Sequence, residues 1–243
     1  MKRLLLIAII ACFFSSTAFA QVSFGPKVGA NFSKYGYSFK ESSDEPEVTF
    51  RFGQSVGAVL NLQITSFLAF QPSANISVKG VAHNVNSWNS GQAVYTGYDR
   101  VRITYFETPL NLALGIRLGQ GQIQVFAGPY LAVAIIGVER WDYEENVNGI
   151  REVDKDNKRV KFRNTVSEED HGDEDVAFYQ KPFDYGVNFG LGYKYKHLLF
   201  NAGFAMGLAN LQPDMSGVEF DPKDYKYSNR TIFITAAWLF GGE

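Results

Sequence analysis

Residues 183–196 alternate strictly between two kinds of side chain. One phase is apolar or aromatic throughout and the other is small or polar, so that Phe183, Tyr185, Val187, Phe189, Leu191, Tyr193 and Tyr195 alternate with Asp184, Gly186, Asn188, Gly190, Gly192 and Lys194. A period of two predicts a β-strand whose faces meet different media. A small and polar face cannot form the core of a water-soluble sandwich, which needs bulky residues inside. Apolar outside and polar inside is typical of a transmembrane β-barrel.

Seven further segments are interpreted as strands of the same kind: residues 22–33, 50–63, 68–79, 105–117, 123–135, 198–208 and 231–240. The segment 123–135 is apolar on both phases. Upstream of 105–117, Val101, Ile103 and Tyr105 place apolar side chains on the phase that is otherwise polar, so we expect a bulge or an exit from the bilayer near Tyr105. Eight strands is an even number, as a bacterial single-chain barrel requires.

The connections between these segments alternate between long and short. The long ones are residues 36–49, 80–99, 140–182 and 210–228, and the short ones are 64–67, 118–122 and 196–197. Long loops at one end and tight turns at the other are the outer-membrane arrangement, with the long loops outside the cell. The sequence therefore predicts an all-β fold, an eight-stranded antiparallel outer-membrane β-barrel.

Glycine and proline positions add two expectations. Eleven glycines fall on the inward phase, where a narrow barrel has little volume: Gly25, Gly29, Gly53, Gly57, Gly115, Gly128, Gly186, Gly190, Gly192, Gly203 and Gly207. Four prolines lie inside the proposed strands, where each removes a ladder donor, and we expect bulges there: Pro26, Pro72, Pro109 and Pro129.

The N-terminus has the pattern of a secretory signal peptide. Two basic residues precede an apolar run over residues 4–14, and Ala18 and Ala20 form an A-x-A cleavage site before Gln21. We expect residues 1–20 to be removed and residues 21–243 to form the barrel domain. An alternative is a lipoprotein processing site that would leave a lipidated Cys12. Cleavage after Ala20 leaves no cysteine, so the exported domain is not held by disulfides.

Composition fits an exported barrel. The mean hydropathy of −0.13 is a value typical of soluble proteins. In a barrel, however, the hydropathies of the apolar outer face and the polar inner face average to a similar value. Aromatic residues make up 15% of the chain, which also has 23 glycines. Beyond the signal peptide no apolar run approaches the ~20 residues of a membrane-spanning helix. A net charge of −2 provides no basic surface for nucleic acid.

Six short motifs, in order along the mature chain, resemble the PorT-type outer-membrane β-barrels of Bacteroidota. They are F-G-P-K-V-G-A-N-F-S at 24–33, L-A-F-Q-P with S-V-K-G at 68–80, Y-F-E-T-P-L at 105–110, A-G-P-Y at 127–130, F-D-Y-G at 183–186 and G-L-A-N-L at 207–211. The chain departs from the family pattern at Ser73, where an acid is usual, and at Ile76, where a tyrosine is usual. The resemblance implies an outer-membrane barrel, and one namesake takes part in type IX protein secretion.

Seven charged residues fall on inward phases: Lys27, Arg51, Lys79, Glu107, Arg117, Asp184 and Lys194. They could line a path for small solutes. We instead interpret them as a paired polar network that fills the lumen, because eight strands leave about enough interior for side chains and buried charges demand partners.

The third long loop, within residues 141–181, carries six acids among residues 168–175. Clustered carboxylates suit Ca²⁺, but the spacing of an EF-hand loop is absent, so we interpret the run as a solvated surface loop. The histidines His83, His171 and His197 are scattered over two long loops and one turn, and hydrolase and phosphate-loop motifs are absent. The sequence predicts no enzyme and no cofactor.

The predicted function is a scaffold in the outer membrane of a Gram-negative cell that presents its outer loops for adhesion, envelope integrity or partner docking. The alternatives are a component of a secretion or transport assembly, a small-solute channel, and an enzyme that would depend on His83 or Asp184. Expected partners are outer-membrane lipid, lipopolysaccharide and other envelope proteins, and no nucleic acid.

Overall fold

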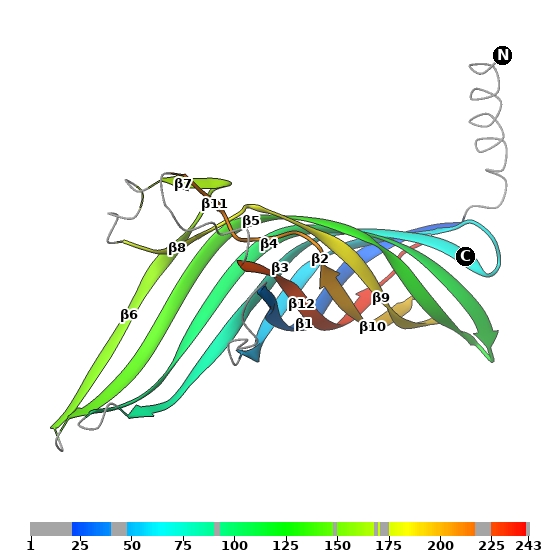
Figure 1. Ribbon diagram of the computed structural model, residues 1–243. Helices are drawn as coiled ribbons and strands as arrows, with labels where there is room; N and C mark the ends of the chain where they lie inside the picture. Colours follow the sequence, from blue (N-terminus) through cyan, green and yellow to red (C-terminus); the bar gives the residue numbers. More distant parts are fainter. Residues whose placement is uncertain are drawn as a thin grey trace, which may run out of the picture.

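The computed structural model describes residues 21–39, 48–89, 93–147, 150–167, 170, 175–216 and 225–241. Figure 1 shows strands wound around a common axis. Eight of them close a ring, each antiparallel to the next, with the last paired to the first. In ring order they are β1 (Gln21–Phe39), β2 (Val48–Gln63), β3 (Leu68–Asn89), β4 (Ala93–Leu118), β5 (Gly121–Val147), β9 (Phe183–Tyr195), β10 (Leu198–Gly207) and β12 (Tyr225–Trp238). The predicted fold class is confirmed.

The two faces of β9 show why these sequences form a barrel. Tyr185 and Leu191 are 52% and 62% exposed on the outside, whereas Asp184 and Asn188 are 1% and 3% exposed on the inside. None of the eleven glycines assigned to the inward phase is exposed. Gly190 and Gly203 are direct partners across β9 and β10, and the ring edge of Phe126 packs over both of them. Small inward residues thus make room for the aromatic side chains that fill the barrel.

The expected irregularity near Tyr105 exists, but it lies on the neighbouring strand. The β4 to β5 register shifts between Thr104, paired with Ile136, and Tyr105, paired with Ala134. The extra residue is Ile135, and both Ile135 and Ile136 face outward, 50% and 60% exposed. Because the bulge is on β5, the phase of β4 never changes.

The three apolar side chains that suggested the irregularity do not turn outward. Val101, Ile103 and Tyr105 stay inside and are at most 3% exposed. They belong to an apolar cluster that includes Tyr35, Val81, Tyr130, Leu211 and Tyr227. The outer half of the lumen is thus filled by apolar and aromatic side chains.

The expected bulges at the prolines are wrong. Pro26 and Pro129 sit in continuous ladders, paired with Ala58 and Val187. Around Pro72 and Pro109 the β3 to β4 ladder passes from the Pro72 and Leu110 pair to the Asn75 and Glu107 pair without a change of register. Local gaps in pairing, and not extra residues, accommodate the missing donors there.

Two of the expected long loops are largely strand. The hairpin of β3 and β4 continues past the barrel, and the far half of β5 pairs with β6 (Ile150–Phe162). These four strands form a sheet that projects beyond the barrel (Figure 1), which we call the projecting sheet. The interpretation of residues 80–99 and 140–182 as loops was wrong because neither stretch has the apolar alternation used to recognise strands. Residues 80–99 are mostly small and polar, and residues 140–160 carry charged residues on both phases.

Three short strands cover the outer end of the barrel. β8 (Val176–Gln180) pairs in parallel with β6, and β7 (Thr165–Ser167) pairs in parallel with β11 (Asp214–Ser216). At the opposite end the predicted tight turns are confirmed. Gly119 has φ of 61° in the turn between β4 and β5, a conformation that favours glycine. In the part of the chain that the structure describes, no helix has the length and hydropathy to cross a membrane.

Candidate functional site

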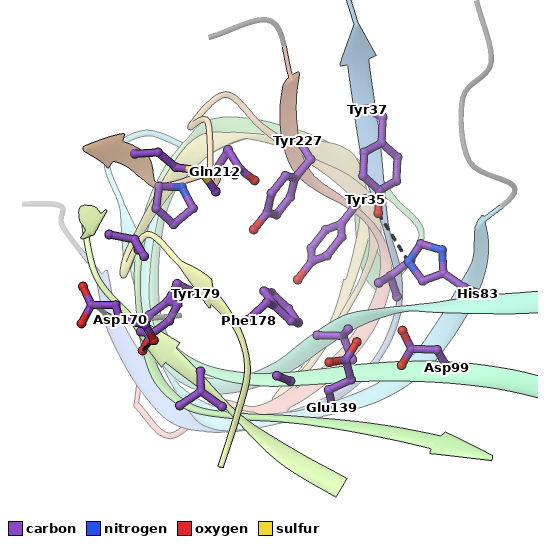
Figure 2. A pocket seen from close by; sticks show the side chains of 17 residues that line it. Tyr35, Tyr37, His83, Asp99, Glu139, Asp170, Phe178, Tyr179, Gln212 and Tyr227 are labelled. Carbon is purple, nitrogen blue, oxygen red and sulfur yellow. Dashed lines mark hydrogen bonds between the residues drawn. The ribbon is translucent and has the colours of Figure 1, made fainter. Parts of the chain in front are cut away.

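A cavity of about 490 Å³ opens at the outer end of the barrel, and we call it the vestibule. Figure 2 shows its lining side chains converging on the space above the barrel. They come from β1, β3, β4, β5, β8 and β12 and from the segments around β7 and β11: Tyr35, Tyr37, Val81, His83, Asp99, Val101, Glu139, Val166, Asp170, Val176, Ala177, Phe178, Tyr179, Gln212, Pro213, Met215 and Tyr227.

Tyrosines form one wall of the vestibule. The ring centroids of Tyr35 and Tyr227 lie 4.8 Å apart, and that of Tyr37 lies 6.2 Å from Tyr35 and 6.1 Å from Tyr227. Tyr37 and Tyr227 are direct partners across β1 and β12. Phe178 and Tyr179 face this wall across the opening (Figure 2). Aromatic faces of this kind bind sugars, apolar groups and organic cations.

An acidic corner lies beside the tyrosine wall. His83 and Asp99 are partners across β3 and β4, and the Glu139 carboxyl lies close to the Asp99 carboxyl. Burial, and then the Asp99 carboxyl, raise the pKa of Glu139 to about 8. At neutral pH the Glu139 carboxyl therefore keeps its proton. Burial lowers the pKa of His83, against the opposing effect of Asp99, and Tyr37 Oη lies 3.4 Å from His83 Nε2.

The raised pKa of Glu139 predicts a pH dependence of stability. The folded pKa of Glu139, about 8, is above its ordinary value of 4.5, so its stabilising contribution is present at low pH and is lost as pH rises through about 8. Between pH 7 and pH 9 we expect the Tm of the detergent-solubilised barrel to fall and the Glu139→Gln variant to lose this dependence. His83 does not interfere, because it is neutral in this range. Parallel Tm curves for both proteins would contradict the assignment.

The floor of the vestibule is Gln180, at the end of β8, which is 0% exposed. Its Oε1 accepts a hydrogen bond of 2.9 Å from Tyr35 Oη, and its Nε2 donates one of 2.7 Å to Tyr105 Oη. One glutamine thus joins the tyrosine wall to the strand on the far side of the lumen.

Beneath this floor lies a buried charged network. Lys79 forms an ion pair with Glu107, and its Nζ is 3.8 Å from Asp184 Oδ2. Asp184 Oδ2 also accepts hydrogen bonds from Tyr130 Oη at 3.1 Å and from Asn229 Nδ2 at 2.8 Å. The lysine ammonium lies 4.5 Å from the centroid of the Tyr130 ring. A lysine flanked by two carboxylates and an aromatic face satisfies charges that have left water.

Around this network the lumen is filled. The cavity that Lys27, Lys79 and Glu107 line has a volume of about 40 Å³, room for a few water molecules. Further toward the periplasmic end, Gln71 donates from Nε2 to both Asn61 and Gln124, at 2.9 Å each. Val59, Leu199, Ala237 and Leu239 form a buried apolar layer below them. Among the described residues, these packed layers fill the lumen between the vestibule and the opposite mouth.

The structure brings together some of the predicted lumen residues and separates others. Lys79, Glu107 and Asp184 form one network, and Lys27 donates to Ser73 Oγ at 2.8 Å beside it. Arg51 lies near three other arginines and not near these carboxylates. Arg117 and Lys194 line the periplasmic mouth with no ion pair among the described residues. Gln21 begins β1, whereas Ala18, Ala20 and Cys12 lie outside the described residues.

Three network residues were missed from the sequence. Gln180 lies in a stretch interpreted as loop, and Tyr105 was assigned to an irregularity. Asn229 sits two residues before the predicted strand 231–240, on its inward phase, and extending the alternation by two residues would have found it.

Only part of the acidic run is described. Residues 168–169 and 171–174, including His171, lie outside the described residues. Asp170 accepts from Ser167 N at 3.1 Å and forms an ion pair with Arg163, and these contacts, the Ser167 backbone first, lower its pKa. Among the described residues no cluster of three or more His, Cys, Asp or Glu could hold a metal ion.

On the projecting sheet, Asp154 accepts a hydrogen bond of 3.3 Å from Trp141 Nε1.

Comparison with known proteins assigns the family. The model of the outer membrane protein beta-barrel domain matches residues 17–212. The chain belongs to this family. It is therefore an outer-membrane β-barrel. No curated protein matches the chain.

Solved structures are similar to this chain only at low identity. The attachment invasion locus protein Ail of Yersinia pestis is 9% identical, with a TM-score of 0.35, and the match covers 90% of this chain and 98% of that one. Its complex with the heparin analogue sucrose octasulfate is 8% identical, with a TM-score of 0.38, covering 90% and 99%. The translocator domain of the autotransporter NalP from Neisseria meningitidis is 7% identical, with a TM-score of 0.18, covering 98% and 95%. Resemblance at this level assigns no ligand.

Proposed function

We propose that this outer-membrane barrel works at its outer end, where the vestibule and the projecting sheet dock a partner from outside the cell. The observation that carries the proposal is the pairing of an open cavity of about 490 Å³ above with a lumen below whose cavity is about 40 Å³. A site that opens outward and ends on a sealed floor suits binding and not passage. Adhesion, envelope integrity and partner docking are the roles that such a surface supports.

The proposal includes no catalytic role. Among the described residues that line the vestibule, none is Ser, Thr, Cys or Lys. His83 contacts Tyr37, while Asp184 is 1% exposed beneath the floor, so the two residues named for an enzyme do not share a site. We assign Lys79, Glu107 and Asp184 a structural role as a plug.

The finer assignments are proposals too. We propose a member of the PorT-type branch in Bacteroidota on the strength of the six motifs, and a place in a secretion assembly is the second candidate function. We further propose that residues 1–20 are a signal peptide cleaved between Ala20 and Gln21, which leaves 21–243 as the barrel domain. A lipidated Cys12 in the mature protein would overturn this boundary.

Site-directed crosslinking on intact cells tests the docking role. The proposed mature chain has no cysteine, so Gln212→Cys would place one thiol-linked photocrosslinker in the vestibule. We expect a covalent adduct with an extracellular protein or glycan. Gln120→Cys, in a turn at the opposite end, is the matched control and should give no such adduct.

The identity of the captured partner separates the two candidate functions. Adducts with components of a secretion assembly would favour the second candidate. Identical adduct patterns from Gln212→Cys and Gln120→Cys, or no adduct from either, would count against docking at the vestibule.

A further inference from the structure

A row of arginines lies on the outward face of the barrel wall. Arg100 and Arg102 alternate with Val101 and Ile103, which are buried inside, so both arginines point outward and are exposed. Arg140 is the direct partner of Arg100 across β4 and β5, and it is also exposed. Three guanidinium groups therefore occupy adjacent positions on one face.

A fourth arginine extends the row across β3. Arg51 on β2 lies within electrostatic range of Arg102, Arg100 and Arg140, and its buried Nε has no hydrogen-bond partner. The intervening strand presents only Gly80, partner of Arg102, and Ala82, partner of Arg100. Arg51 pairs with Ser33 on β1, and the β2 to β3 register shifts between Phe50 and Ser55, so it is the electrostatic contact with the three arginines that places Arg51 beside the row. A small anion placed between them could contact Arg51 and the row.

In the part of the chain that the structure describes, no carboxylate pairs with this row. Asp142, further out on the same face of β5, is bound by Lys155 at 2.8 Å, and Glu144 by Arg151 at 2.6 Å. Asp99 and Glu139 point into the vestibule. Arg100 packs against the Tyr98 ring at 3.9 Å, which orients the guanidinium while leaving its N–H groups available.

The row lies directly above the lipid-facing band. From Arg102, β4 continues toward the membrane through Thr104, whose partner Ile136 is 60% exposed. Phe106 follows on the same face and is 46% exposed. On β2 the neighbour of Arg51 is Phe52, 53% exposed. Since the projecting sheet marks the outer end of the barrel, these arginines sit where the head groups of the outer leaflet meet water.

We propose that Arg51, Arg100, Arg102 and Arg140 form a binding site for the phosphate groups of the outer-leaflet glycolipid, the lipid A part of lipopolysaccharide. Guanidinium groups bind phosphate oxygens in pairs of parallel hydrogen bonds, and clustered basic residues at a membrane surface attract anionic head groups. The proposal depends on the outer-membrane location but not on the docking role of the vestibule. A phosphate bound between these arginines supplies the counter-charge that no described carboxylate provides.

The test measures retention of lipopolysaccharide by the purified mature barrel after detergent washing. The variant is Arg100→Gln with Arg102→Gln and Arg140→Gln, which leaves the lumen and vestibule untouched. At about 1 kcal/mol per basic residue near a charged surface, each lost arginine should weaken retention about fivefold, so the triple variant should lose roughly a hundredfold. The matched control is Arg117→Gln with Lys194→Gln and Lys196→Gln, which removes the same charge at the opposite mouth.

A second probe keeps the proposal testable if the triple variant fails to fold. Wild-type protein should bind enzymatically dephosphorylated lipopolysaccharide as weakly as the triple variant binds the intact form, and inorganic phosphate at millimolar concentration should compete only slightly. Equal retention of intact and dephosphorylated lipid by the wild type would overturn the proposal. So would equal losses in the triple variant and in the control.

Discussion

Replacing Lys79 with methionine should destabilise the barrel by about 3–5 kcal/mol, the cost of breaking a buried ion pair. The substitution leaves Glu107 and Asp184 buried beside each other without their shared cation. Asp184 is 1% exposed and cannot regain hydration unless the barrel opens. Urea denaturation in detergent micelles, followed by the shift between folded and unfolded bands on gels, measures the loss.

Two further variants distinguish the effect of the unpaired charges on stability from the effect of lost packing. Adding Glu107→Gln and Asp184→Asn to Lys79→Met removes the orphaned charges and should recover most of the stability. Lys194→Met removes an inward cation that is only partly buried and has no ion pair among the described residues, so it should have little effect. Equal losses for Lys79→Met and Lys194→Met would mean that the ion pair does not stabilise the lumen.

Gly25→Val should prevent the barrel from closing, at a cost of about 3 kcal/mol or more, the upper end for overpacking. A Cβ at Gly25 would overlap the backbone carbonyl oxygen of Trp238 on β12, which cannot move as a flexible side chain could. β1 and β12 are the first and last strands of the ring, so the overlap falls on the seam that closes it.

The fraction of refolded protein that resists unfolding in cold SDS measures this effect. Ala58→Val, on the lipid face of the neighbouring strand opposite Pro26, adds the same side chain where space is open and should refold like the wild type. If Gly25→Val refolds as well as Ala58→Val, close approach at the seam is not what requires glycine.

The sequence was most informative where one face of a strand meets lipid. All eight membrane-crossing strands could be located because apolar residues such as Leu191 and small residues such as Gly190 must alternate there. The same rule failed outside the bilayer. Residues 93–104, 136–147 and 150–160 pair as strands although charged side chains occupy both faces, since water accepts either face.

Register and long-range pairing explain the other misses. A one-residue insertion shows its position only through the partner strand, which is why the irregularity expected on β4 proved to be Ile135 on β5. The contact of Gln180 with Tyr35 and Tyr105 joins residues separated by 145 and 75 positions in the chain. By contrast, the sequence could suggest that Lys79, Glu107 and Asp184 are partners. The interior of a narrow barrel is small, so charged side chains that point into it lie close to one another.

The unbroken passage of β4 and β5 from the periplasmic turn to the far tip, 26 and 27 residues long, has a mechanical consequence. A partner bound at the tip would pull along two continuous strands, with no hinge between the tip and the barrel. Backbone hydrogen bonds run perpendicular to the strands. A force along the strands therefore loads many of these hydrogen bonds at once in shear, instead of breaking them one at a time by unzipping. A pulling force at the tip would thus be transmitted directly to the barrel, whereas flexible loops would first have to extend.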